Sequence, residues 1–527
     1  LMTESLPLIN EGATTDLKDF VSRGGGLVVL PPRSKQLLTS LLVSTESLSE
    51  SGEGDLPRKV RRCLFADDLI PGTEGLVVTR RGGYDIDFRG NQGTSSSDPD
   101  TEPQPTLAIH QHGKGRVLVW NTLAPTKREA RGLVVQSVMA VQPVAVQPIA
   151  NVAVIQIDDF PAGFTEQMQE PIATEYGINN ITFWREMWLP DMLALSREFE
   201  IPYTYFIPFN YNQRVDPPYE FEGWERAVVD VDGQQQFFSR YCLEQIKSGG
   251  ELALHGYNHV PLATEHWGSK SNMLAALGQA ARRWKADDFG RPPVSYVPPM
   301  NEFDSIGAQA VAEAFPSVKV ICSSFSSPYE KGGNRDFGPE PWNTKLFSLP
   351  RVTSGHKISN MMRMSMTSAV NTMGVWTHFL HPDDIFDNPI NRPEGRYFRN
   401  PKVLSWRIDS INRQQGLYDQ FREWIEFANH NYPWLRYMRT DEAYQIVEQH
   451  LQNQVRVTFE SDRVVLRSLK PTYLHVRIND GRTIDMGQAE GARLLHVAKG
   501  TNYTQFTIEM TGRELELSLE REAEAGQ

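Results

Sequence analysis

Short apolar runs separated by helical patterns fill the middle of the chain, between residues 151 and 450. Many of the intervening segments repeat apolar residues at helical spacing, as in "SNMLAALGQAARRWKADD". Strands that alternate with helices form parallel βαβ units, and about seven such units predict a distorted (β/α)7-8 barrel. The seven runs are 152–157, 203–208, 251–255, 294–298, 318–322, 346–350 and 374–381.

The two flanking segments have other patterns. "TTDLKDFVSRGGGLVVLPP" predicts a helix, a glycine stop and a strand, and the segment around it predicts an α/β domain with long polar loops. The tail alternates apolar and polar residues, with Asp480-Gly481 and Thr511-Gly512 where hairpin turns belong, which predicts a small antiparallel β domain. We therefore expect three domains, at 1–145, 146–450 and 451–527.

Composition excludes several classes of partner. The formal net charge of −12 argues against a nucleic acid, and no apolar run approaches the roughly 18–20 residues of a membrane span. Three cysteines, Cys63, Cys242 and Cys322, are too few for a disulfide framework. The chain starts "LMTESLPLIN", without the pattern of a signal peptide. Because Gly24–Gly26 precede a strand instead of opening a helix after one, we expect no flavin or NAD in the first segment.

Polar residues appear where several of the predicted strands end. Chemistry in a parallel barrel collects at the carboxyl ends of its strands. The candidates at these ends are Asp158, Asp159, His255, His259, Pro298 to Asn301, Arg351, His378 and His381.

Two histidines and one aspartate are suited to hold a catalytic metal. His255 and His259 are four residues apart, so a helical turn would place both imidazoles on one face. Two imidazoles and a carboxylate leave positions open for water and substrate. The alternative is that the histidines lie on a surface turn and that Asp158 and Asp159 cap another.

The adjacent aspartates are a poor acid and base pair for a glycosidase. Such a pair faces each other about 5–9.5 Å apart across the sugar. Neighbours in an extended strand point to opposite faces, so Asp158 and Asp159 are expected to have separate tasks. One would bind the metal and the other would act on a water molecule.

The motifs "IDDFP" (157–161) and "HGYNH" (255–259) resemble those of metal-dependent polysaccharide deacetylases. The resemblance implies that Asp158 is the general base. It implies that Asp159, His255 and His259 bind Zn²⁺ or another divalent metal such as Co²⁺ or Ni²⁺. A histidine after the last barrel strand is the general acid in that family, and "FLHPDD" places His381 there. His378 lies three residues earlier, so strand alternation turns it to the opposite face, as a structural residue or a substrate contact.

The third motif of the family is altered in this chain. "YVPPMN" keeps its proline as Pro299, which implies that the Met300 backbone N–H binds the oxyanion, but the family's arginine position holds Val297. Arg351 could supply the missing cation near Asp158.

Further residues near the motifs are candidate sugar contacts. Aromatic rings can stack on sugar faces but are core residues at least as often. The candidates are Trp184, Trp188, Tyr257, Trp267, Tyr296 and Asn301.

The arrangement of segments looks similar to one branch of these enzymes, the carbohydrate esterase family 18 deacetylases and the deacetylases of the Pel polysaccharide system. That likeness implies a flavodoxin- or amidotransferase-like first domain, a trailing β-sandwich-like domain and a location outside the cell or in the periplasm. The implied activity is de-N-acetylation of a polymer of N-acetylgalactosamine or N-acetylglucosamine. A barrel that binds glycan without cleaving it, and a metal-dependent amidase for another amide, stay open as alternatives.

Overall fold

The computed structural model describes residues 11–29, 76–81, 85–90, 107–120, 127–161, 165–395, 397–408, 413–500 and 502–521. Cys63 and the two polar stretches that were predicted to form long loops lie outside these ranges.

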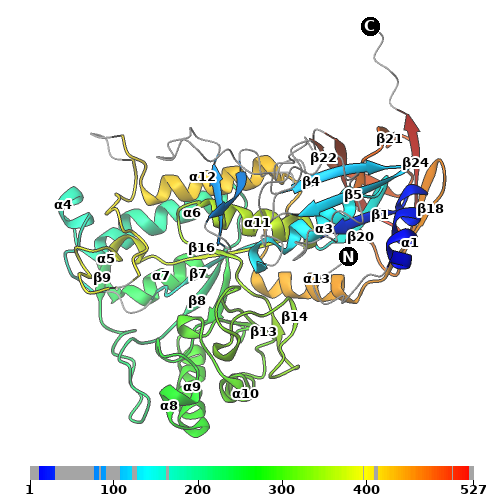
Figure 1. The fold of residues 1–527 in the computed structure, drawn as a ribbon. Coiled ribbons are helices and arrows are strands. Elements are labelled where there is room, and N and C mark those ends of the chain that lie inside the picture. Colours follow the sequence, from blue (N-terminus) through cyan, green and yellow to red (C-terminus); the bar gives the residue numbers. More distant parts are fainter. Residues whose placement is uncertain are drawn as a thin grey trace.

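A curled sheet of nine strands forms the centre of the molecule (Figure 1). Every neighbouring pair in it is parallel except β14 with β15. In sheet order the strands are β14 (Gly338–Pro339), β15 (Phe347–Ser348), β13 (Val320–Ile321), β12 (Ser295–Tyr296), β11 (Glu251–Leu254), β8 (Thr204–Ile207), β7 (Val152–Asp158), β17 (Val375–Leu380) and β16 (Thr353–Ser354).

The stretch from β15 to β16 joins the two sides of this sheet. The Arg351 N–H donates to the Ser323 carbonyl after β13, at 2.8 Å, while the next N–H, of Val352, donates to Thr377 of β17, at 3.1 Å. One extended segment is therefore bonded to β13 on one side and to β17 on the other, so the sheet curls back on itself. The parallel, barrel-like sheet predicted from the seven apolar runs is confirmed.

Helices cover the outside of the curled sheet (Figure 1). Side chains cap free backbone N–H groups at the start of some of them, as Ser269 does for α9 and Asp304 for α10. The helices of this part are α4 (Ile172–Tyr176), α5 (Asn180–Phe183), the π-helical turn η6 (Trp184–Trp188), α6 (Leu189–Glu198), α7 (Phe238–Ile246), α8 (Thr264–Trp267), α9 (Lys270–Ala286), α10 (Ser305–Ala314), α11 (Asn360–Met373), α12 (Leu417–Asn431) and α13 (Thr440–Gln452). A hairpin, β9 (Val228–Val231) and β10 (Gln234–Phe237), precedes α7.

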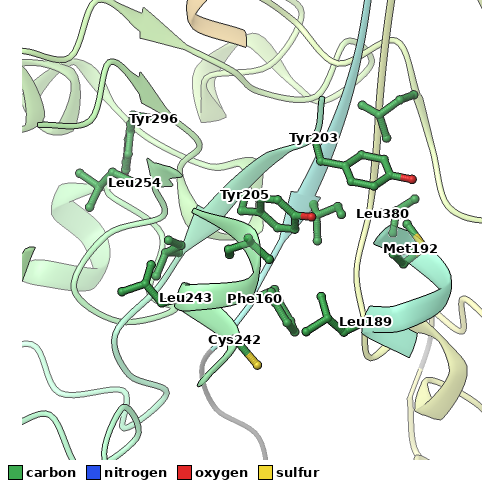
Figure 2. Packing of buried hydrophobic residues seen from close by; sticks show 14 of the residues in the cluster. Phe160, Leu189, Met192, Tyr203, Tyr205, Cys242, Leu243, Leu254, Tyr296 and Leu380 are labelled. Atoms are coloured by element: carbon green, nitrogen blue, oxygen red, sulfur yellow. The ribbon is translucent and has the colours of Figure 1, made fainter. Parts of the chain in front are cut away.

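The core lies between the sheet and these helices and fixes the end of β7. All seven residues of β7 are buried, as expected of a parallel strand covered on both faces. Phe160, directly after the aspartate pair, packs on Trp188 and on Tyr205 of β8, with ring centroids 4.9 and 6.1 Å away. Figure 2 shows Phe160 and Tyr205 in this core. The aspartates are thus held between a buried strand and a buried ring.

The first segment contains a three-stranded sheet, in which β1 (Gly26–Val29) is parallel and β4 (Leu107–His112) antiparallel to β5 (Gly115–Trp120). The predicted helix, glycine stop and strand are confirmed, since α1 (Glu11–Ser22) precedes Gly24 and β1. The segment also has the pair β2 (Leu76–Arg81) and β3 (Asp85–Gly90), the 3-10 turn η5 (Arg128–Ala130) and α3 (Arg131–Ala140).

The C-terminal part has two four-stranded antiparallel sheets around a shared apolar core. One contains β18 (Val455–Phe459), β19 (Arg463–Ser468), β24 (Glu514–Arg521) and β21 (Arg482–Ile484). The other contains β22 (Ala492–Gly500), β23 (Tyr503–Met510), β20 (Thr472–Ile478) and β6 (Val144–Ile149). Strand β6 comes directly before β7, so a segment from before the barrel completes a C-terminal sheet. The domain limits stay a prediction.

Two predicted hairpins are wrong. The turn at Asp480-Gly481 leads from β20 to β21, and the turn at Thr511-Gly512 leads from β23 to β24. In both cases the two strands belong to different sheets. These dipeptides specify a turn, but which strands pair depends on the packing of the two sheets. Within the described residues, no helix is both long enough and apolar enough to cross a membrane.

Candidate active site

The polar residues that end or follow the barrel strands lie together, because parallel strands bring their carboxyl ends to the same side of the barrel. Asp158 is the last residue of β7, His255 follows β11, Arg351 lies between β15 and β16, and His381 follows β17. All four are nearly or fully buried.

The two aspartates do not follow strand alternation. Asp159 has a φ of 63°, in the left-handed region, so the extended geometry ends at this residue. Asp159 Oδ1 lies 3.2 Å from His255 Nε2, and Asp158 Oδ2 lies 3.7 Å from His381 Nε2. The prediction that the pair points to opposite faces is therefore wrong, because the turn at Asp159 brings both carboxylates to one cluster of histidines.

Asp159, His255 and His259 form a set of donors suited to a metal. Their ligand atoms all lie within 4.8 Å of one another, and Asp159 Oδ1 is 3.5 Å from His259 Nε2. The predicted helical turn is wrong: residues 255–259 form a bend, in which Gly256 has a φ of 96°. The bend still directs both imidazoles at Asp159.

The hydrogen bonds of this set leave its donor atoms free. His255 Nδ1 is 2.7 Å from the Val297 carbonyl oxygen, which fixes the proton on Nδ1 and leaves Nε2 with its lone pair. Asp159 Oδ1 is buried and has no hydrogen-bond partner among the described residues. The three residues thus fit a divalent cation, with open positions as in catalytic sites.

The pKa values of Asp159 and His259 favour metal binding, whereas contacts with Asp159 and Asp158 outweigh burial and raise the pKa of His255. Burial acts to raise the pKa of Asp159, but His259 and His255 outweigh it and hold this pKa well below its ordinary value. Burial lowers the pKa of His259, which favours the neutral imidazole that a metal requires.

Arg351 lies against Asp158. Its Nη1 is 2.5 Å from Asp158 Oδ2, its other terminal nitrogen donates to the Asn301 side-chain oxygen, and its guanidinium stacks on the Phe379 ring at 3.6 Å. Asp158 Oδ1 is buried without a hydrogen-bond partner among the described residues. The carboxylate is therefore held by one oxygen, and the other is free to accept a proton.

His381 is oriented by Asp384, a residue that sequence reasoning missed. Asp384 Oδ1 lies 3.3 Å from His381 Nδ1, and Asp384 Oδ2 accepts the His381 backbone N–H at 3.2 Å. Arg399 donates to Asp384 at 2.9 Å. Sequence carried a signal, since "HPDD" puts this aspartate three residues after the histidine.

His378 is outside the site, as strand alternation predicts. It is fully buried, its Nδ1 is 2.9 Å from Thr353 Oγ1, and its ring stacks on Phe421 of α12. Burial lowers the pKa of His378 to about 3, so the ring stays neutral. The prediction that His378 contacts the substrate is therefore wrong, because its side chain faces the helices that cover the sheet.

The aromatic candidates are core residues. Their side chains are buried, Tyr257 donates to the Glu220 carbonyl at 2.6 Å, and Trp184 donates to the Pro382 carbonyl at 3.1 Å. This corrects the prediction that Trp184, Trp188, Tyr257, Trp267 and Tyr296 stack on sugar, because no ring face is open. Met300 differs: it has a φ of 56° and a side chain that is 61% exposed beside Asn301.

These residues define a class of site: a carboxylate and histidine cluster at the carboxyl end of a parallel barrel, with donors for one metal ion. A family profile matches residues 12–490, and the chain belongs to that family, described as "Uncharacterised protein conserved in bacteria (DUF2194)". No curated protein sequence matches the chain.

Several solved structures align with parts of the chain at low similarity. The Xyl-CE4 domain of a multidomain xylanase from the hindgut metagenome of Trinervitermes trinervoides is 12% identical, with a TM-score of 0.26, over 56% of this chain and 90% of that one. Puue allantoinase is 10% identical, with a TM-score of 0.33, over 56% and 90%. The Nostoc punctiforme debranching enzyme is 9% identical, with a TM-score of 0.28, over 71% and 99%.

Proposed function

We propose that this chain is a metal-dependent hydrolase that removes acetyl groups from the amino sugars of a polysaccharide and releases acetate. One observation carries the proposal. A buried carboxylate with a free oxygen, Asp158, lies beside a set of two histidines and one aspartate and also beside His381. This combination would supply a base, the donors for a metal ion and an acid around one point.

Asp159, His255 and His259 would hold the metal, with Zn²⁺ the first choice for two imidazoles and a carboxylate. A bound divalent cation lowers the pKa of water toward about 7 and polarises a carbonyl oxygen. Co²⁺ and Ni²⁺ suit the same nitrogen and oxygen donors.

Asp158 is placed to act as the base. Its free oxygen Oδ1 would accept the proton of a water molecule that attacks the acetamide carbonyl. Arg351 holds the other oxygen and so fixes the orientation of the carboxylate. In this role Arg351 replaces the cation that is missing at Val297.

His381 is placed to act as the acid. Its Nε2 faces the Asp158 carboxylate and would give a proton to the departing sugar amine. Asp384 at Nδ1 fixes the orientation and the tautomer of the ring. The Met300 backbone N–H would donate to the oxyanion of the tetrahedral intermediate.

The finer proposal concerns the identity of the polysaccharide and the location of the protein. The likeness of the segment arrangement to the carbohydrate esterase family 18 and Pel-system branch favours a polymer of N-acetylgalactosamine or N-acetylglucosamine. An exopolysaccharide of this kind would place the protein outside the cell or in the periplasm.

Acetate release tests the proposal. Purified protein would be incubated with oligosaccharides of N-acetylgalactosamine, with those of N-acetylglucosamine and with an N-acetylated peptide, each with Zn²⁺ or with a chelator. We expect Zn²⁺-dependent acetate from an oligosaccharide. Acetate from the peptide alone would instead indicate an amidase of another kind, and glycan binding without acetate would indicate a barrel that only binds.

A further inference from the structure

A second buried histidine, His356, contacts the aspartate that orients His381. His356 Nδ1 lies 3.2 Å from Asp384 Oδ2, while His381 Nδ1 lies 3.3 Å from the other carboxylate oxygen, Oδ1. The His356 side chain is buried, and its Nε2 has no hydrogen-bond partner among the described residues. Two imidazoles therefore share one carboxylate, and neither the motifs nor the proposed reaction gives His356 a task.

The two histidines occupy equivalent positions after neighbouring parallel strands. Ser354 of β16 is paired with Phe379 of β17. His356 and His381 each follow the paired residue of their own strand by two positions. The Gly355 N–H donates to the Phe379 carbonyl at 2.8 Å and continues the bonding between the two strands. The pairing of β16 with β17 therefore brings both imidazoles to the same end of the barrel, where one carboxylate can contact both.

The two oxygens of Asp384 have different sets of partners. Oδ1 also accepts from Arg399 at 2.9 Å, whereas Oδ2 also accepts the backbone N–H of His381 at 3.2 Å. Among the described residues, His356 is thus the one contact that holds Oδ2 from outside the segment that Asp384 has to orient. Burial acts to raise the pKa of Asp384, but Arg399 and then the two histidines outweigh it and hold this pKa well below its ordinary value. Because an ionised carboxylate can only accept, the contact places a proton of His356 on Nδ1.

The ring of His356 is itself fixed by packing. It meets the rings of Trp406 and Phe421 edge to face, with centroids 5.6 and 5.9 Å away. This packing holds the plane of the imidazole, so Nδ1 stays directed at Asp384. The packing would suit any ring of similar size, whereas the contact with the carboxylate needs an N–H donor.

We propose that His356 is a positioning residue, which holds Asp384 in the orientation that lets this aspartate direct His381. The inference rests on the proposed function, in which His381 protonates the departing amine, and it adds a residue to that step. It separates two properties of one side chain, the ring that the core packs against and the N–H that Asp384 accepts. Two substitutions at His356 should therefore differ in effect.

Acetate release by variants of His356 tests the inference. His356→Phe keeps a ring and removes the donor, whereas His356→Asn removes the ring and keeps an N–H close to the position of Nδ1. His475→Phe is the matched control, because His475 is a buried histidine of β20 whose Nδ1 is 3.1 Å from the Thr507 hydroxyl and whose ring meets Trp434 edge to face. With oligosaccharides of N-acetylglucosamine and of N-acetylgalactosamine, kcat and KM are measured as a function of pH. Affinity for Zn²⁺ is measured by competition with a chelator.

We expect His356→Phe to lower kcat by roughly 3–10-fold, the usual size of one hydrogen bond, with KM and Zn²⁺ affinity unchanged. The fall of kcat at high pH should move to higher pH, because Asp384 without this donor stabilises a charged His381 more strongly. His356→Asn should keep more turnover than His356→Phe, and His475→Phe should behave like the unaltered protein. The remaining charged groups around His381 and Asp384 are the same in every variant: Asp158, Asp383 and Arg399.

Unchanged kcat, or a lower kcat with unchanged pH dependence, in folded His356→Phe would overturn the inference and leave the proposed function standing. A lower kcat in folded His356→Asn than in His356→Phe would also overturn it, because a ring that only fills the core predicts that order. If the unaltered protein releases no acetate, the proposed function is wrong and the inference falls with it. Circular dichroism shows whether each variant is folded. If His356→Asn is not, the pH dependence of His356→Phe decides, and if His356→Phe is not, His356→Gln takes its place, because its N–H corresponds to Nε2 instead.

Discussion

The barrel has a cluster of buried carboxylates at each end, and the two clusters are built differently. Glu251 begins β11 at the amino end, beside Asp441 of α13. Asp158 and Asp159 lie at the carboxyl end of β7. All four are buried.

At the amino end the carboxylate oxygens of Glu251 are satisfied. Oε1 accepts the Ser295 hydroxyl at 2.6 Å, and Oε2 accepts the Thr204 hydroxyl and the Asp441 N–H, both at 3.0 Å. Asp441 in turn contacts Arg291 and Arg439. This cluster ties α13 to the ends of three strands.

At the carboxyl end the partners are an arginine and histidines, and two carboxylate oxygens are left without a hydrogen bond among the described residues. Asp158 Oδ1 and Asp159 Oδ1 have no hydrogen-bond partner among the described residues, although each carboxylate faces Arg351 or histidines. An unsatisfied buried polar group costs about 1–3 kcal/mol. Burial alone therefore does not mark a site: satisfied oxygens indicate a structural tie, whereas unsatisfied oxygens beside imidazoles indicate a place prepared for a ligand.

The largest effect should come from Asp158→Asn. Asparagine keeps the shape but cannot accept a proton, so acetate release should fall roughly 10²–10⁴-fold while metal content stays the same. Glu251→Gln is the matched control, because it removes a buried carboxylate at the other end and should leave turnover close to that of the unaltered protein. Similar losses in both variants would contradict the distinction between the two ends.

The next effect should come from Asp159→Asn. A neutral amide replaces an anionic ligand, so metal affinity should fall by more than the roughly 10–100-fold that is typical of an outer partner. Some acetate release should return when excess Zn²⁺ is added, whereas Asp158→Asn should not recover. Metal analysis of His255→Ala beside the unaltered protein checks the same set, and equal metal content in both would rule out His255 as a ligand.

A smaller effect should come from Asp384→Asn. Asparagine can no longer stabilise a charged His381 or fix its tautomer, so turnover should fall by roughly 10–100-fold, at or below the usual range for an acid or base. The dependence of turnover on pH should also change, while Zn²⁺ affinity should not. A loss of metal instead of turnover would assign Asp384 to the metal centre.

The smallest effect should be on the free energy of unfolding, and it should come from Glu251 at the amino end of the barrel. Burial, followed by the charge of Asp441, raises the pKa of Glu251 from 4.5 to about 7. A carboxyl group with a higher pKa in the folded state stabilises the fold fully below its unfolded pKa, and this contribution is lost as the pH rises through the folded pKa. The free energy of unfolding should therefore fall between about pH 4.5 and 7 by on the order of 2–3 kcal/mol from this group.

Glu251→Gln should flatten that decline, because glutamine does not titrate. Chemical denaturation at pH 4.5, 6 and 7.5 measures the slope for both proteins. An equal slope in both would show that Glu251 does not titrate in this range.

Sequence by itself predicted the parallel, barrel-like sheet and the position of Asp159, His255 and His259 at one end of it, and the resemblance of their motifs predicted them as metal ligands. Seven apolar runs separated by helical patterns predicted parallel units, and the position of Asp159, His255 and His259 after two of those runs placed them at one end. Strand alternation also predicted that the side chains of His378 and His381 point to opposite faces of the strand. These inferences succeed because strand period, strand direction and strand ends are local properties, and parallel strands bring their carboxyl ends together.

Only the tertiary structure decided the rest. The left-handed φ of Asp159 brings both aspartates to one cluster, which strand period could not predict. The ring of Tyr211 on His259, the contact of Arg351 with Asp158 and the burial of Tyr296 each depend on residues far away in the sequence. The two wrong hairpins have the same cause, since a turn dipeptide sets a local bend while the partner of a strand is chosen by packing. Loop conformation and side-chain neighbours are set by contacts that form only when distant segments meet, so no local pattern specifies them.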